Sequence, residues 1–140
     1  MKYFIDTNVI IDLLNNDKDA KKQLKALFLE EGSELFINRL IVMETLRTIH
    51  FEHKRVFREA QENLKLFGQL DIRPQIYEEA VAFSRFCNTK LHFTLKGRCE
   101  AIDFLHFITA KYYNLIMVSN DGDMPKLEEA YVKFLESLDE

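Results

Sequence analysis

Cysteine, proline, glycine and tryptophan are scarce in this chain of 140 residues, which has two cysteines, two prolines, four glycines and no tryptophan. Two cysteines do not make a disulfide framework or a zinc site, so we expect a reducing, cytoplasmic environment. So little glycine and proline, together with 47% hydrophobic residues, excludes collagen-like and disordered chains. The length suits one domain, and we predict that residues 1–140 form a single domain.

Long apolar runs are also missing. The longest, such as those at 40–43 and 115–118, are far shorter than the roughly 20 residues that a membrane-spanning helix needs. Asp6 and Asp12 interrupt the N-terminal segment, where a signal peptide would need an apolar core. We therefore expect neither a signal peptide nor a membrane partner.

The net charge is −4 and the isoelectric point is near 5.6. Proteins that bind nucleic acid strongly are usually basic overall. This chain would need a local basic patch or a bridging metal ion to bind a polyanion, so the positions of its acids matter more than their number.

Short apolar segments alternate along the chain with longer amphipathic ones. Strands are predicted at 2–5, 34–37 and 115–118, with weaker candidates at 70–72 and 131–134. Helices are predicted at about 9–14, 19–30, 40–51, 56–67, 74–88 and 99–113, with a short one after Pro125. Strands that alternate with helices form a parallel sheet. We predict an α/β fold with a central parallel sheet of about four to five strands, covered by helices on both faces, and with 115–118 as a central strand.

Four acids occupy unusual positions in this pattern. Asp6 and Asp121 directly follow predicted strands, while Glu44 and Asp103 interrupt apolar helical segments. Each has an ordinary explanation when taken singly: a helix cap, a turn residue, or a solvated acid on an amphipathic helix. Ligands of open parallel sheets bind at the carboxyl ends of the strands, so the four together indicate a cluster of carboxylates.

Clustered carboxylates repel one another unless cations neutralise them. An all-oxygen cluster suits Mg²⁺ or Mn²⁺ rather than zinc. Such ions activate water and stabilise charge on a phosphate under attack, and they let an acidic protein approach a phosphodiester backbone. The pattern therefore favours metal-dependent chemistry on phosphate esters.

These motifs resemble those of the PIN-domain ribonucleases, and the length and spacing are most similar to the VapC-type toxins of toxin–antitoxin pairs. The resemblance covers nearly the whole chain and rests on Asp6-Thr7-Asn8 after the first strand, Glu44 on a helix, the segment from Asp103 to Ala110, and Ser119-Asn120-Asp121-Gly122-Asp123 after a late strand. It implies a Mg²⁺- or Mn²⁺-dependent endoribonuclease that is inhibited by a small antitoxin protein and is usually a homodimer.

The resemblance also implies roles for individual residues. The acidic catalytic set would be Asp6, Glu44, Asp103 and Asp121; Asp6, Asp103 and Asp121 would hold the metal ion; Thr7, Asn8, Asn120 and Asp123 would be supporting residues. Two positions depart from the family pattern. Met124 stands where an aromatic residue commonly follows the last acid, and Phe107 stands where a smaller residue is frequent.

Basic residues gather around the Glu44 helix and before the Asp103 helix. We predict that Arg39, Arg47, Lys96 and Arg98 contact RNA phosphates. The phenylalanines Phe28, Phe51, Phe57, Phe67 and Phe83 are expected in the core rather than as platforms for base stacking. An apolar groove between the second helix and the helices of 40–67 could receive an antitoxin helix.

Two alternatives stay open at this stage. Asp6-Thr7-Asn8 is similar to the opening of haloacid-dehalogenase-type phosphotransferases, in which the first Asp is the nucleophile, although Asn8 replaces their second acid and no convincing catalytic lysine motif follows. The chain could also be a catalytically silent PIN-like binding module. The intact set of four acids favours the nuclease over the silent module.

Overall fold

The computed structural model of the chain describes residues 1–92, 95 and 100–139. Within these residues, four strands alternate with seven helices, in the order β1 (Lys2–Ile5), α1 (Thr7–Leu14), α2 (Lys18–Leu29), β2 (Glu34–Asn38), α3 (Arg39–Leu46), α4 (Lys54–Leu64), β3 (Gly68–Leu70), α5 (Pro74–Lys90), α6 (Glu100–Tyr112), β4 (Ile116–Val118) and α7 (Met124–Leu138). The chain divides into a sheet unit, made of 1–71 and 115–120, and a helical unit, made of the described residues of 72–114 and 121–140.

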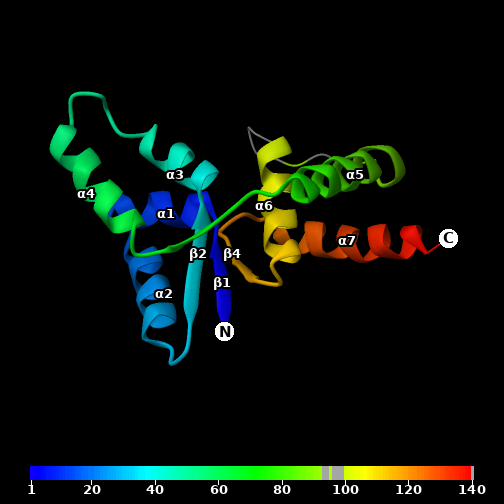
Figure 1. Ribbon diagram of the computed structural model, residues 1–140, viewed down its shortest axis with the longest axis horizontal. Helices are drawn as coiled ribbons and strands as arrows, with labels where there is room; N and C mark the ends of the chain where they lie inside the picture. The colour runs from blue at the N-terminus through cyan, green and yellow to red at the C-terminus, as the bar shows by residue number, and fades with distance from the viewer. Residues whose placement is uncertain (93–94, 96–99, 140) are drawn as a thin grey trace. The chain divides into compact units, whose positions relative to one another are not determined.

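The sheet unit is built on four parallel strands in the order β3-β2-β1-β4, which confirms the predicted α/β class. Figure 1 shows β1 and β2 side by side. The chain passes from β1 through β2 to β3 and then returns, so that β4 pairs with the other side of β1. The strand order therefore reverses between β1 and β4. In open parallel sheets, such a reversal marks the place where ligands bind, outside the carboxyl ends of the strands.

The prediction that 115–118 is a central strand is wrong, because β4 lies at the edge of the described sheet. Ile116 is 44% exposed, and only Val118 of this strand is buried. An apolar run does not by itself distinguish a central strand from an edge strand. The central position belongs to β1, which buries Tyr3, Phe4 and Ile5 in succession, as a strand covered on both faces does.

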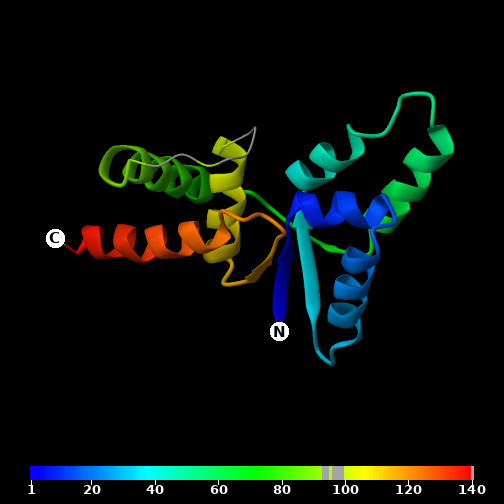
Figure 2. The ribbon, with the colours of Figure 1, turned by 180° about the vertical axis from the view of Figure 1, so that it is seen from behind.

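Side-chain caps set the starts of three helices in the sheet unit, and Figure 2 shows α1 and α2 from the opposite side. The Asn38 amide oxygen accepts a hydrogen bond from the Ile41 amide at 2.9 Å, at the start of α3. The Asp17 carboxylate caps α2 by accepting a hydrogen bond from the Ala20 amide at 2.9 Å. Asp6 caps α1, so that helix begins at Thr7, two residues before the predicted start at residue 9.

Two boundaries in the middle of the chain also differ from the prediction. The helix expected at 40–51 ends at Leu46, which leaves residues 47–53 as a connection between α3 and α4. The strand expected at 70–72 is Gly68–Leu70, because Gly68 pairs with Phe36 of β2. The absence of a side chain at Gly68 leaves space for the Phe36 ring.

The helical unit packs α5, α6 and α7 around aromatic rings. The Phe83 ring lies 5.4 to 5.6 Å from the rings of Phe104, Phe107, Tyr131 and Phe134, measured between centroids. The strand predicted at 131–134 is wrong, since these residues belong to α7. Leu127, Ala130 and Phe134 are buried at helical spacing, and that longer period determines the structure of the segment. Nowhere in the described part of the chain does a helix have the length and apolar character needed to cross a membrane.

Replacing Gly68 tests the packing of β3 on β2. An added Cβ would stand 2.5 Å from Cδ1 of Phe36, so the ring must move. We expect Gly68→Ala to lower the free energy of unfolding by about 1–3 kcal/mol in urea titrations. Gly122→Ala is the matched control, because nothing lies within 4 Å of its added Cβ. Equal effects of the two substitutions would contradict this packing argument.

Candidate active site

Asp6 lies at the carboxyl end of β1, beside the end of β4. Its backbone amide donates to the Val118 carbonyl at 2.9 Å, which continues the pairing of the two strands by one residue. One carboxylate oxygen accepts a hydrogen bond from the Thr7 amide, and the other accepts one from the Ser119 hydroxyl, both at 2.8 Å. The side chain is only 7% exposed. Groups that follow both strands therefore fix the orientation of this carboxylate.

Glu44, on the half-buried face of α3, joins the same group of residues through Thr7. The Thr7 hydroxyl donates to the Glu44 carboxylate at 2.8 Å, while the Thr7 backbone amide donates to Asp6. Two acids that are 38 positions apart in sequence thus bond to a single residue. The structure brings together the predicted residues Asp6, Thr7 and Glu44.

Asn8 and Asn120 extend this network across the strand ends. The Asn8 side-chain amide donates to the Ser119 hydroxyl at 3.3 Å, and its oxygen accepts a hydrogen bond from the Asn120 backbone amide at 3.1 Å. The Asn120 side chain in turn donates to Asp12 at 3.0 Å. Both asparagines therefore position the backbone that follows β4 relative to the start of α1.

Ser119 is a member of this network that the sequence names within a motif but to which no role was assigned. Its hydroxyl both donates to Asp6 and accepts from Asn8. The signal available in the sequence was a hydroxyl residue directly after a strand, next to the predicted Asn120. That signal is weak, because serine is common at such turns.

The remaining predicted acids belong to the helical unit. Asp103 is half-buried in the first turn of α6, directly before the continuously buried stretch Phe104–Ala110. The Asp121 carboxylate accepts a hydrogen bond from the Asp123 amide at 2.9 Å, in the turn that leads into α7. Asp123 is 5% exposed and stands at the N-cap position of that helix.

The donors of the candidate site are carboxylate oxygens, which suit a hard cation such as Mg²⁺ or Mn²⁺. The predicted ligand set takes Asp6 from the sheet unit and Asp103 and Asp121 from the helical unit. A metal site within one unit would need a group of three or more His, Cys, Asp or Glu side chains. The described residues of each unit contain no such group. The metal ion remains a prediction that fits the chemistry of these donors.

Two of the four residues predicted to contact RNA are described by the structure. Arg39 and Arg47 are exposed, at the first residue of α3 and at its C-cap. Lys96 and Arg98 lie outside the described residues.

The expected burial of five phenylalanines holds for only two of them. Phe67 and Phe83 are buried, but Phe28, Phe51 and Phe57 are 44%, 91% and 37% exposed. Phe51 lies outside any helix because α3 ends at Leu46, so no amphipathic face carries its ring into the core.

Comparison with known families identifies the fold. Residues 3–130 match the PIN domain family. The chain belongs to the PIN domain family. This membership removes the basis for the phosphotransferase alternative, because the Asp-Thr-Asn motif after β1 is then explained by a different family.

Two solved structures resemble this PIN domain. A toxin–antitoxin complex from Klebsiella pneumoniae matches with a TM-score of 0.64 at 20% identity, over 85% of this chain and 86% of that one. VapBC2 from Rickettsia felis, bound to a DNA fragment from their promoter, matches with a TM-score of 0.74 at 15% identity, over 91% and 93%. At these identities the likeness shows a shared fold. Among curated proteins, no sequence matches the chain.

Substitution of Ser119 tests whether its hydroxyl holds Asp6. We expect Ser119→Ala to lower the free energy of unfolding by roughly 1–3 kcal/mol, because a largely buried carboxylate loses a donor. Ser119→Thr keeps the hydroxyl and should restore most of that loss. Urea titrations of the three proteins measure this, and an alanine variant as stable as the wild type would argue against the contact.

Proposed function

We propose that this PIN domain is a Mg²⁺- or Mn²⁺-dependent endoribonuclease and the toxin of a toxin–antitoxin pair. The observation that carries the proposal is the position of Asp6, which is held where the strand order reverses and is joined through Thr7 to Glu44. Family membership and the fold shared with two toxin–antitoxin proteins support it.

In this proposal the side chains of the chain prepare an electronegative site. Thr7 and Ser119 each donate to a different oxygen of Asp6, so that both oxygens keep a fixed direction and retain lone pairs for a cation. Asp103 and Asp121 would complete the ligand set, and Glu44 would accept a proton from the attacking water and so orient it. A bound Mg²⁺ or Mn²⁺ would supply water activation and neutralise charge on the phosphate.

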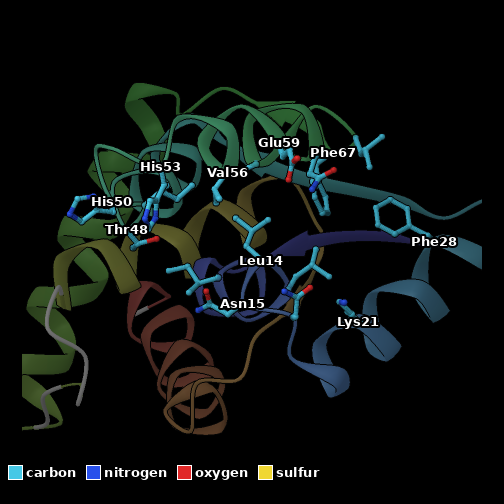
Figure 3. A pocket seen from close by; sticks show the side chains of 17 residues that line it. Leu14, Asn15, Lys21, Phe28, Thr48, His50, His53, Val56, Glu59 and Phe67 are labelled. Carbon is cyan, nitrogen blue, oxygen red and sulfur yellow. The ribbon is translucent and has the colours of Figure 1, made fainter.

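The proposed antitoxin partner has a candidate docking groove within the sheet unit. A groove of about 780 Å³ runs between the end of α1, α2 and α4 (Figure 3). Leu14, Phe28 and Val56 contribute apolar surface, while Lys21 and Glu59 lie among the polar lining residues. An amphipathic helix buries its apolar face in a groove of this kind. We propose an antitoxin helix as the occupant, because two solved structures of this fold are toxin–antitoxin complexes.

The substrate and the assembly are implied by the family resemblance, and the location is expected from the scarcity of cysteine. We expect RNA as the substrate, a homodimer as the assembly and the cytoplasm as the location. A catalytically silent binding module is the competing hypothesis, and it differs from the nuclease in having no turnover.

Loss of the Asp6 charge should abolish activity. We expect Asp6→Asn to reduce Mg²⁺- or Mn²⁺-dependent RNA cleavage by at least about a hundredfold, because a principal ligand loses its charge. Cleavage of a labelled RNA measures this effect, and circular dichroism checks the fold. Asp19→Asn is the matched control, since Asp19 is an exposed acid on α2. Cleavage that survives Asp6→Asn, or that EDTA leaves unchanged, would reject the proposal.

Metal binding should also be visible without turnover. An ion that binds only the folded chain stabilises it, so millimolar Mg²⁺ or Mn²⁺ should raise the melting temperature of the wild type. The rise should shrink in Asp6→Asn and persist in Asp19→Asn. An identical response in wild type and Asp6→Asn would show that Asp6 is not a ligand.

A further inference from the structure

The connection between α3 and α4 and the start of α4 expose aromatic rings that folded proteins normally bury. Residues 47–53 form this connection, which extends away from both helices in Figures 1 and 2. Phe51 lies in it and is 91% exposed, and Phe57 on the first turns of α4 is 37% exposed. Both rings line a groove of about 690 Å³. They contribute little to the core, so their exposure calls for another explanation.

Cations surround these rings. Arg47, Lys54 and Arg58 line the same groove, and no described acid does. In the part of the chain that the structure describes, these three side chains form no ion pair, whereas the neighbouring Arg55 is paired with Glu59. The groove is thus a locally basic surface on a chain whose net charge is −4.

Exposed aromatic rings among unpaired cations are typical of surfaces that bind single-stranded nucleic acid. The cations contact phosphates, and the rings stack on bases without regard to their identity. The surface also begins close to the candidate site, because Arg47 follows Glu44 by one helical turn. An acidic peptide would match the positive charge of the groove. Charge pairing alone, however, would not require the exposed rings of Phe51 and Phe57.

We propose that the α3–α4 patch, made of Arg47, Phe51, Lys54, Phe57 and Arg58, binds a single-stranded segment of the RNA substrate. Arg47, Lys54 and Arg58 hold phosphates, and Phe51 and Phe57 stack on bases. The assignment rests on the proposed ribonuclease function and adds to it a surface that holds the RNA beside Glu44.

The stacking part is tested by equilibrium binding of a fluorescent single-stranded RNA to the Asp6→Asn chain, which keeps the RNA intact. Phe51→Ala in this background should weaken binding about tenfold. Phe51→Trp should keep the affinity, since it keeps an aromatic face. Tyr77→Ala on α5 is the control, because Tyr77 is an aromatic residue that is 51% exposed elsewhere, and it should leave binding unchanged.

The electrostatic part is tested by the salt dependence of the same binding. Replacing Arg47, Lys54 and Arg58 together by alanine should reduce the slope of log K against log salt by about 2, at roughly 0.7 for each phosphate that the variant no longer neutralises. The charge-matched control replaces three exposed lysines of α2, Lys18, Lys22 and Lys25, and should leave the slope unchanged.

The outcomes separate this inference from the proposed function. If the patch variants bind and cleave RNA as the wild type does, the patch assignment is overturned and the nuclease stands. If Phe51→Ala weakens the binding of an abasic strand as much as the binding of a normal strand, the proposed stacking on bases is overturned. The patch variants could also lose binding to anionic vesicles and keep the RNA affinity of the wild type. That result would make the patch a membrane-binding surface and overturn the proposal. If the wild type cleaves no RNA but RNA binding falls in the variants, the nuclease proposal fails and the patch assignment is supported.

Discussion

The candidate site depends on one hydrogen-bonded junction, in which the Asp6 carboxylate is held between the ends of β1 and β4. The Asp6 backbone amide continues the pairing of the two strands, and the Thr7 amide and the Ser119 hydroxyl each bond to one carboxylate oxygen. This junction exists because the chain builds β1, β2 and β3 in one direction and then returns to the other side of β1. The topology thereby places a buried acid where a parallel sheet is open to a ligand.

Much of the sheet unit could be predicted from local pattern, because its signals are short-range. The aromatic and β-branched run at 2–5 predicts β1 correctly, and the strand predicted at 34–37 matches β2 apart from its last residue. The position of β4 at the edge could not be predicted in the same way. Strand order is set by long-range packing, and an apolar run of four residues carries no information about its neighbours.

The errors elsewhere have a similar cause. Residues 131–134 consist of aromatic and β-branched residues apart from one lysine, which is typical of a strand, but the burial of Leu127, Ala130 and Phe134 at helical spacing determines a helix. The early end of α3 leaves Phe51 exposed, which no hydrophobicity pattern reveals. Ser119 was missed because its role depends on the approach of two strands that are more than a hundred positions apart in sequence. The predicted roles of the acids, by contrast, came from residue order within a family pattern.

The two bonds that Thr7 makes to the acids differ in kind, and this has a genetic consequence. Asp6 is bonded by the backbone amide, which every residue except proline possesses, while Glu44 is bonded by the hydroxyl, which only the side chain provides. A change at position 7 can therefore remove this bond to Glu44 while the backbone bond to Asp6 remains. Natural variation at this single position can therefore change the hydrogen bonding of Glu44 and leave the backbone bond to Asp6 in place.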